Sequence, residues 1–193
     1  MHPTVLISGA TRGMGLATTR LLARHGYRVF AGHRSESGRQ TLIELAAEAD
    51  APIVPIALDV QDPACVDAAV AAVVAQTGKL DILINNAGYG LVAAVEDGTD
   101  EEFIHQFDVN VFGVLRLARA AIPTMRRQGH GLIINVSSFL GHMGLPLLAH
   151  YSASKYAVEG ITDALRAELR AFGIRVHTVA PGLFRTDFVR HGL

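Results

Sequence analysis

The fold of this chain is decided near its beginning by the stretch TVLISGATRGMG, residues 4–15 of 193. Its first part, Thr4 to Ser8, is a short apolar run rich in β-branched residues, which predicts a buried strand. Glycines follow at positions 9, 13 and 15, and from Met14 to His25 apolar residues recur at three- and four-residue spacing. The stretch therefore predicts a strand, a tight glycine-rich turn and a helix, in that order.

The same alternation continues along the chain. Five later runs are expected to be strands: Tyr27 to Ala31, Ile53 to Ala57, Leu80 to Ile84, Leu132 to Val136 and Ile174 to Val179. Four later stretches are expected to be helices: about Gly38 to Ala49, Pro63 to Gln76, Glu101 to Arg127 and His150 to Phe172. Strands of this kind, apolar at consecutive positions, belong to a parallel sheet that is covered on both faces. The predicted fold class is α/β, a doubly wound parallel sheet of six strands with helices on both faces.

The composition excludes several classes of protein. A hydrophobic content of 50% suffices for one core, and no linker or repeat divides the chain, so residues 1–193 are expected to form one domain. A net charge of −1 without a basic stripe disfavours nucleic acid, and no stretch could span a bilayer. We expect a small-molecule substrate and a cytoplasmic location.

Neither cysteine nor histidine indicates a metal or a disulfide. Cys65, the single cysteine, lies in an Ala/Val-rich helical stretch and is expected to be a small buried filler. The nine histidines form no close pair at metal-ligand spacing with Cys or a carboxylate. No metal is therefore predicted, and a zinc-dependent alcohol dehydrogenase is disfavoured.

The glycines of the first turn suit a bound dinucleotide. Gly9 permits a sharp turn, Gly13 lets the backbone approach a pyrophosphate, and Gly15 lets the helix pack close to the strand. The helix N-terminus then offers free N–H groups and the positive end of its dipole to the phosphates. The alternative is a glycine-rich turn that binds no ligand.

The end of the second strand indicates which nicotinamide cofactor is preferred. NAD enzymes usually place an acid there to hold the ribose 2′-hydroxyl, but this segment reads Ala31-Gly32-His33-Arg34. Arg34, with Arg12 from the glycine turn, could face a 2′-phosphate, because guanidinium groups match phosphate oxygens. The sequence favours NADP(H) over NAD(H), unless the two arginines fall there by chance.

A tyrosine and a lysine stand four residues apart at the start of the last predicted helix. This i, i+4 spacing puts Tyr151 and Lys155 on one helix face, where the ammonium would lower the pKa of the phenol. Tyr151 is therefore a candidate general acid/base. The alternative is a surface pair, but the chain holds only two lysines, Lys79 and Lys155, which makes the placement informative.

Together these motifs resemble the short-chain dehydrogenase/reductase family, of the type with a one-domain Rossmann fold. The resemblance extends along nearly the whole chain. It rests on the glycine turn, on Tyr151-xxx-Lys155, and on three further markers: Asp59-Val60 after the third strand, Asn85-Asn86-Ala87-Gly88 after the fourth, and Pro181-Gly182-xxx-Thr186 after the sixth.

The resemblance implies a catalytic set of Asn110, Ser138, Tyr151 and Lys155. Ser138, thirteen residues before Tyr151, would bind the substrate oxygen, and Ser137 would be structural. Asn110 would hold a water for a proton relay, although on its own it reads as a helix-interior Asn bonded to backbone. The expected cofactor contacts are Gly9, Thr11, Arg12, Gly13, Met14, Gly15, His33, Arg34, Asp59, Val60, Asn86, Ala87, Gly88, Tyr151, Lys155, Pro181, Gly182 and Thr186.

The implied activity is hydride transfer between NADP(H) and a carbonyl or alcohol, with Tyr151 exchanging the proton and Ser138 polarising the oxygen. Side chains expected near the substrate are mostly apolar: Leu91, Val92, Leu140, His142, Leu145 and Phe184. Two alternatives are a non-catalytic NADP(H)-binding sensor or scaffold on the same fold, and a sugar-nucleotide epimerase, whose differently spaced glycine turn does not match.

Two expectations concern what surrounds this domain. The family's members continue into a substrate-covering segment, a helix and a seventh strand, so this chain is expected either to lack them or to be the ordered part of a longer protein. The helices from Glu101 and from His150 carry more apolar and small residues than one sheet face needs. The surplus could be core, but the resemblance implies that these helices build the interface of a homodimer or homotetramer.

Overall fold

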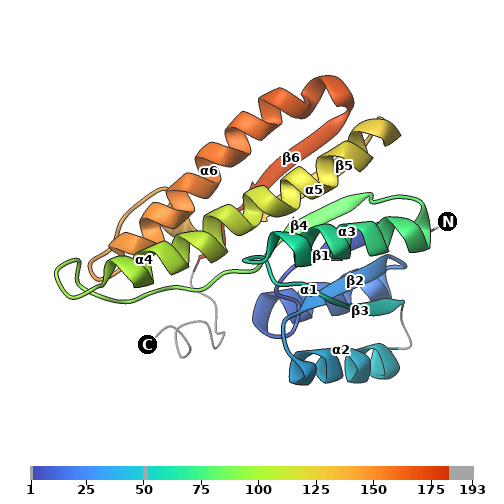
Figure 1. Cartoon of the computed structure of the whole chain (residues 1–193), viewed down its shortest axis with the longest axis horizontal. Coiled ribbons are helices and arrows are strands. Elements are labelled where there is room, and N and C mark those ends of the chain that lie inside the picture. The colour runs from blue at the N-terminus through green and yellow to red at the C-terminus, as the bar shows by residue number, and fades with distance from the viewer. Residues whose placement is uncertain (1, 50–51, 183–193) are drawn as a thin grey trace.

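The chain has the expected doubly wound α/β fold. The computed structural model describes residues 2–49 and 52–182, and its six strands form one sheet in the order β3-β2-β1-β4-β5-β6, with every neighbouring pair parallel (Figure 1). The strands are β1 (Thr4–Ile7), β2 (Arg28–His33), β3 (Ile53–Ala57), β4 (Ile82–Asn85), β5 (Gly131–Val136) and β6 (Ile174–Val179).

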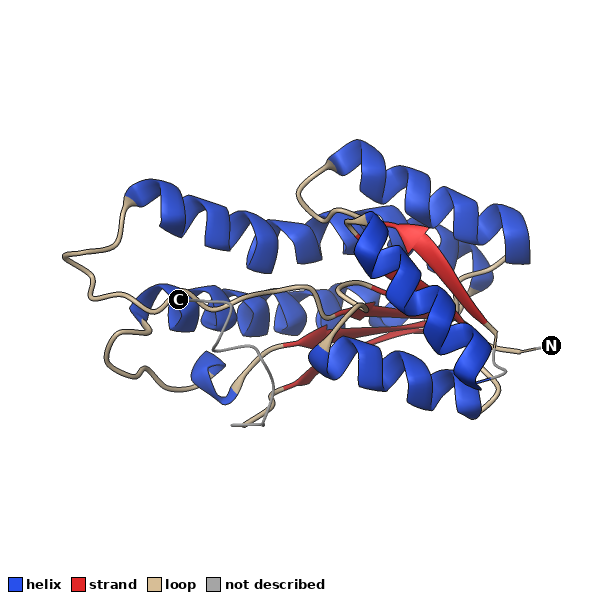
Figure 2. Cartoon of the chain, turned by 90° about the horizontal axis from the view of Figure 1, so that it is seen from below, coloured by secondary structure: helices blue, strands red, loops and turns tan. Residues whose placement is uncertain are grey.

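Helices connect the strands and cover both faces of the sheet, as the view along its edge shows (Figure 2). The α-helices are α1 (Gly13–Arg24), α2 (Glu36–Ala49), α3 (Pro63–Thr77), α4 (Asp100–Phe107), α5 (Gly113–Gln128) and α6 (Ala149–Leu169). Three short elements complete the set: the π-helix η1 (Asp108–Phe112) and the 3₁₀-helices η2 (Phe139–Gly141) and η3 (Arg170–Phe172).

Two apolar cores, one on each face, hold the layers together. Leu6, Phe30, Leu83 and Ile133 pack against α3, α5 and α6. Their strand neighbours Val5, Ile7, Val29 and Ala31 point to the other side and pack against α1 and α2. Because successive strand residues face opposite ways, consecutive apolar residues are what a strand covered on both sides requires.

The strand β6 forms one edge of the sheet and is covered on one face. Ile174 and Val176 are buried under α6, whereas Arg175 and His177, which alternate with them, are exposed within the described part of the chain. The strand β2 runs two residues further than expected, since Gly32 lets it pass close to Leu58 and His33 still pairs with Ala57.

One expected element differs in kind. The stretch Glu101 to Arg127 was predicted as one α-helix, but its middle is the π-helix η1, so that α4, η1 and α5 follow one another without a break. A π-turn contains an extra residue and often occurs at functional sites. Here it contains Asn110, which is 1% exposed.

Candidate functional site

The glycine turn after β1 has a geometry that only glycine permits. Gly9 and Gly13 have φ of +63° and +51°, in the left-handed region that disfavours side chains. A Cβ on Gly15 would lie 2.1 Å from the Gly9 carbonyl oxygen and 2.6 Å from Asn86 Nδ2. The close approach at Gly15 is thus to the turn and to the segment after β4, rather than to the strand itself.

Hydrogen bonds of Ser8 and Asn86 join this turn to the segment after β4. The backbone N–H groups of Asn86 and Ala87 donate to Ser8 Oγ at 3.1 and 3.0 Å. Asn86 Nδ2 donates in turn to the carbonyl oxygens of Ser8 and Gly9 at 3.0 and 2.9 Å. The sequence did not single out this support by Ser8, since a serine directly after a strand is ordinary in a turn.

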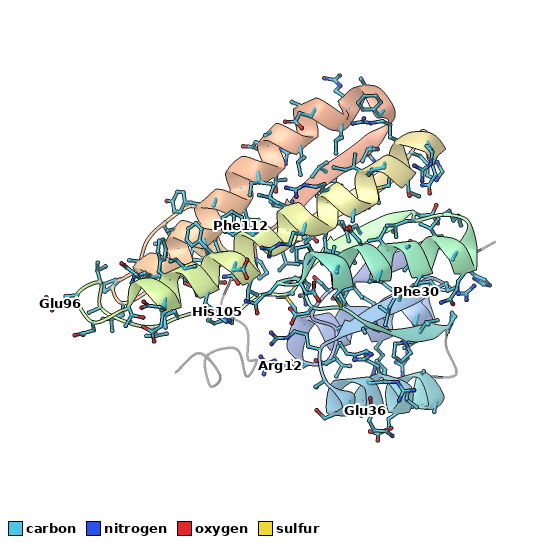
Figure 3. The ribbon with its side chains drawn as sticks, in the orientation of Figure 1. Arg12, Phe30, Glu36, Glu96, His105 and Phe112 are labelled. Carbon is cyan, nitrogen blue, oxygen red and sulfur yellow. The ribbon has the colours of Figure 1, made fainter. Side chains whose placement is uncertain are left out.

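The first turn of α1 is open to a ligand. Its N-cap is Arg12, whose side chain makes no capping hydrogen bond, so none of the first N–H groups is covered by a side-chain cap. Arg12 is exposed and projects outward from the turn (Figure 3). Free N–H groups at a helix start, next to backbone without side chains, fit the pyrophosphate of a dinucleotide.

The β2–α2 junction lies directly beside this turn. A Cβ on Gly38 would be 2.8 Å from Thr11 Cγ2, so the start of α2 touches the glycine turn. Ser35 Oγ accepts a hydrogen bond from Gly38 N at 3.1 Å and lies 3.0 Å from Ser37 Oγ. Arg34, next to Ser35, is exposed at the same corner.

His33, the last residue of β2, has a buried Nδ1 that makes no hydrogen bond to any described residue. Glu36 is the acid closest in sequence to Arg34, and it is engaged by Arg39 in an ion pair of 2.7 Å. The corner thus combines a buried imidazole nitrogen that has no described hydrogen-bond partner with an exposed guanidinium group.

The segment after β3 is held by its own turn and by α5. Asp59 Oδ1 accepts from Gln61 N at 3.0 Å, and Cys65 Sγ accepts from Asp59 N at 3.3 Å. Cys65, which was expected to be a buried filler, is only partly buried and supports the Asp59 turn. The Val60 carbonyl oxygen accepts from Arg116 Nη1 at 3.0 Å.

The helix α6 carries Tyr151 and Lys155 on its inner face, and both are buried, with 7% and 5% of their surface exposed. Lys155 Nζ lies 5.7 Å from the centre of the Tyr151 ring and donates to the Val136 carbonyl oxygen at 2.8 Å. That bond anchors the ammonium group at the end of β5.

The protonation of this pair differs from the expectation in one respect. Burial raises the pKa of the Tyr151 phenol, and a hydrogen bond with Ser138 opposes this shift without cancelling it. Burial also lowers the pKa of Lys155 to about 8. The expected lowering of the phenol pKa by the ammonium was therefore wrong for this structure, because desolvation dominates both groups.

The two serines after β5 lie in different surroundings. Ser138 caps the short helix η2, where its Oγ accepts from Leu140 N at 3.2 Å, and it also bonds to Tyr151. Ser137 Oγ is buried and makes no hydrogen bond to a described residue. The structure thus brings Ser138, and not Ser137, to the phenol.

Asn110 bonds outside its own helix. Its Oδ1 accepts from Tyr89 N at 3.1 Å, and its Nδ2 donates to the Tyr89 carbonyl oxygen at 2.9 Å and to Ser154 Oγ at 3.1 Å. A Cβ on Gly88 would lie 3.1 Å from Asn110 Oδ1 and 3.7 Å from Lys155 Nζ. Gly88 therefore lies beside both the Asn110 amide oxygen and the Lys155 ammonium group, where a side chain would crowd them. The roles of Tyr89 and Ser154 had no signal in the sequence.

Two loops beyond the sheet edge hold the start of α6 in place, and Figure 1 shows them side by side at the far end of α4 and α6. Ala93 N donates to the Leu147 carbonyl oxygen at 2.9 Å, and Leu147 has a φ of +65°, a strained value for a leucine. The His150 ring packs edge-on against Phe103, with ring centres 5.2 Å apart.

The remaining predicted residues lie at the edge of what the structure describes. The Pro181 carbonyl oxygen accepts from Phe139 N at 3.0 Å, and nothing lies within 4 Å of a Cβ built on Gly182. Thr186 and Phe184 fall outside the described residues. Leu140, expected beside the substrate, is 4% exposed, whereas His142 and Leu145 are exposed.

Within residues 2–49 and 52–182, no three His, Cys, Asp or Glu side chains come together in an arrangement that could hold a metal ion. None of the helices described in those ranges combines the length and the apolar character that a membrane crossing requires.

The fold and the glycine turn together define a Rossmann-type α/β protein. A family model described as short chain dehydrogenase matches residues 3–192. The chain therefore belongs to the short-chain dehydrogenase/reductase family, as its motifs predicted.

Known relatives agree with this assignment. The chain is 39% identical over 189 residues to the 3-ketodihydrosphingosine reductase of Bacteroides thetaiotaomicron, an alignment that covers 97% of this chain and 66% of the relative. The chain thus spans about two thirds of the length of that relative.

Solved structures show the same fold. A gluconate 5-dehydrogenase from Burkholderia cenocepacia, in complex with NADP and tartrate, is 33% identical with a TM-score of 0.92, over 98% of this chain and 74% of that one. A Phe-to-Trp variant of actinorhodin polyketide ketoreductase with NADPH is 38% identical with a TM-score of 0.92, over 96% of this chain and 72% of that one.

Proposed function

We propose that this protein is an NADPH-dependent reductase of small ketones or aldehydes that can also run the reverse alcohol oxidation. The observation that carries the proposal is the convergence of four side chains from three separate elements: Asn110 from η1, Ser138 after β5, and Tyr151 and Lys155 from α6. They lie at the carboxyl edge of the sheet, where ligands of open α/β folds bind, beside an uncapped glycine turn.

Each side chain has a chemical task in the proposed mechanism. Ser138 holds the substrate oxygen and Tyr151 donates a proton to it, since the two hydroxyls are already bonded to one another. The raised pKa of Tyr151 keeps the phenol protonated and ready to donate near neutral pH. Bound NADPH would supply the hydride.

Lys155 would return a proton to Tyr151, and Asn110 would support the site around them. The Lys155 ammonium, fixed on the Val136 carbonyl oxygen, stabilises the phenolate that forms and offers it a proton. Asn110 fixes the wall of the same space through Tyr89 and Ser154. Gly9, Gly13, Met14 and Gly15 would bind the pyrophosphate, while Asp59, Val60, Ala87 and Gly88 would line the adenine and ribose positions.

The preference for NADPH rests on the corner formed by Arg12, His33 and Arg34. No acid ends β2, and the exposed arginines stand on the two segments that touch at Thr11 and Gly38. Two of the solved relatives hold NADP or NADPH, which supports the same choice here.

The proposal is tested by NADPH and, separately, NADH consumption with a panel of ketones, aldehydes and quinones. We expect faster turnover with NADPH, and we expect Tyr151→Phe to abolish turnover while it retains NADPH binding. Undiminished turnover by Tyr151→Phe would contradict the acid/base role. NADPH binding without turnover by the wild-type protein would instead favour a sensor or scaffold.

We propose further that residues 1–193 form one nucleotide-binding domain and that the protein assembles as a homodimer or homotetramer through α4, α5 and α6. Ile104, Phe112 and Tyr156 are 63%, 47% and 49% exposed on this side, and Figure 3 shows Phe112 where α5 and α6 run together. Light scattering should show an oligomer that Phe112→Asp weakens; a wild-type monomer would contradict the assembly.

A further inference from the structure

A partly buried carboxylate lies one helical turn beyond Lys155. Glu159 follows Lys155 at i+4 on α6, and its side chain is only 16% exposed. Its Oε1 atom is buried, and its described polar neighbour is the exposed imidazole of His142, with Nε2 at 3.3 Å. A partly buried carboxylate whose described partner is an exposed imidazole is a candidate counter-charge for a buried cation nearby.

The helix η2 closes over this carboxylate. A Cβ built on Gly141 would lie 3.1 Å from Glu159 Cγ, 3.2 Å from the Lys155 carbonyl oxygen and 2.7 Å from Ser137 Oγ. Any side chain at position 141 would therefore push η2 away from α6. On the inner face of this turn of α6, Lys155 and Val158 are buried under the close packing at Gly141, and an electric field acts strongly in such a place.

Few charges compete with Glu159 in these surroundings. From the η2 side, His142 Nε2 comes within 3.3 Å of Glu159 Oε1, but this imidazole is 62% exposed, and exposed pairs contribute little. Ser138 after β5 and Asn110 on η1 do not titrate near neutral pH, and Tyr151 on α6 is held protonated. The next carboxylate on α6, Asp163, is 72% exposed and bound to Arg166 at 2.6 Å.

Lys155 needs such a partner more than most lysines do. It is fully desolvated, and burial alone lowers its pKa, which stands at about 8; the charge of Glu159 acts in the opposite direction. No ion pair within 4.0 Å joins the two side chains among the described contacts, so the carboxylate acts through space across one turn of α6 rather than by contact.

We propose that Glu159 is a positioning residue whose carboxylate supplies the counter-charge that keeps the Lys155 ammonium protonated in its buried site. This role rests on the task that the proposed function gives to Lys155. Without Glu159, the lysine would lose its proton at lower pH, and Tyr151 would lose the cation that stabilises its phenolate.

The two lysines of this chain allow a direct test that needs no turnover. Protein labelled with ¹³C at the lysine ε-carbon gives two signals, from Lys79 and Lys155, which the Lys79→Gln variant assigns. We expect the titration midpoint of Lys155 to fall by about half a pH unit or more in Glu159→Gln, roughly a threefold change in proton affinity. The Lys79 signal is the internal control, because Lys79 pairs with Asp81 at the opposite edge of the sheet.

Asp163→Asn is the matched control, since it removes the next carboxylate on the same helix. An unchanged Lys155 midpoint in Glu159→Gln, or an equal shift in Asp163→Asn, would overturn the proposal. Glu159→Asp keeps the negative charge, so its Lys155 midpoint should fall less than that of Glu159→Gln. If Glu159→Gln does not fold, Glu159→Met provides a second neutral side chain of similar length.

Kinetics supply an independent readout. In ketone reduction with NADPH, the basic limb of the pH profile should move to lower pH in Glu159→Gln by the same amount as the Lys155 midpoint. If the wild-type protein turned over no ketone, the proposed function would be contradicted, whereas the effect of Glu159 on the Lys155 titration would be unaffected. A shifted midpoint with an unshifted kinetic limb would overturn the role of Glu159 in the reaction.

Discussion

The side chain of Asn110 occupies both backbone hydrogen-bonding groups of Tyr89, accepting from its N–H at 3.1 Å and donating to its carbonyl oxygen at 2.9 Å. Because Tyr89 directly follows Gly88, this pair of hydrogen bonds fixes the segment after β4 against η1. Gln106 Nε2 also donates to the Tyr89 carbonyl oxygen, at 3.1 Å. The position of Gly88 relative to Lys155 thus depends on two amide side chains, of which only Asn110 holds both backbone groups of Tyr89.

Asn110→Ala should destabilise the fold and slow turnover. It leaves the Tyr89 N–H without a partner in a partly buried place, which costs about 1–3 kcal/mol. Urea unfolding measures the first effect and kcat with NADPH the second. Gln40→Ala, which removes an exposed amide bonded to Glu44 on α2, is the control and should change neither. Equal free energies of unfolding for Asn110→Ala and the wild-type protein would show that the two hydrogen bonds to Tyr89 do not stabilise the fold.

Arg34→Asp should change the choice of cofactor. The new carboxylate would repel a 2′-phosphate, and the lost charged hydrogen bond is worth roughly 1.5–3 kcal/mol, so NADPH should bind at least tenfold more weakly. NADH affinity should hold or rise. Fluorescence titration with both nucleotides checks this, with Arg24→Asp at the exposed end of α1 as the charge-matched control. Unchanged NADPH affinity in Arg34→Asp would rule out a contact with the 2′-phosphate.

Lys155→Met should stabilise the folded protein near neutral pH while it abolishes activity. The pKa of Lys155 is lowered from 10.5 to about 8 by burial, so the folded state binds the proton less readily than the unfolded state. Below pH 8 the charged lysine therefore costs up to about 3 kcal/mol, and this cost fades as the pH rises toward 10.5. Guanidinium unfolding at several pH values should show the wild-type protein approaching the variant in stability between these limits. If the free energies of unfolding of the wild-type protein and Lys155→Met differed by the same amount at every pH, the lowered pKa would be contradicted.

Asp81→Asn should weaken the opposite edge of the sheet in a pH-dependent way. Burial acts to raise the pKa of Asp81, but hydrogen bonds from Lys79, Thr4 N and His130 outweigh it and hold that pKa below its ordinary value of 3.8. Its stabilisation is therefore complete above that value and is lost as the pH falls through the lowered pKa.

At pH 7 we expect Asp81→Asn to lose about 1–2 kcal/mol in thermal or urea unfolding, since the side chain is only 15% exposed. The difference from the wild-type protein should shrink toward pH 3. Glu36→Gln, which breaks an exposed ion pair, should have little effect at any pH. A constant difference between Asp81→Asn and the wild-type protein over the whole range would contradict the assigned charge.

The sheet could be predicted from the sequence because its strands carry apolar residues on consecutive positions, a pattern that depends on little besides burial on two faces. All six strands were found where expected, with shifts of one or two residues at several ends. The family could also be predicted, since its markers follow successive strands and fall at one sheet edge. Glycine positions were informative for the same reason: at Gly9 and Gly15 the backbone itself leaves no room for a side chain.

Features that depend on contacts between distant segments could not be predicted. The π-helix at Asp108–Phe112 lies in a stretch with ordinary helical spacing, and it is held by bonds from Asn110 to Tyr89 and Ser154 and from Arg116 to Val60. The direction of the Tyr151 pKa shift was also wrong, because spacing along a helix gives the neighbour of a phenol and says nothing about its burial.

The wide turn at η1 also sets the rotation of α5 about the helix axis relative to α4. A residue beyond the normal helical repeat rotates everything after it by about 100° around the axis. Removing one residue from Asp108–Phe112 would let α4 and α5 merge into a regular helix. Either Asn110 would then turn away from Tyr89, or the buried face of α5, which carries Leu117 and Met125, would rotate off the sheet. At this point a one-residue deletion would therefore do more damage than most substitutions.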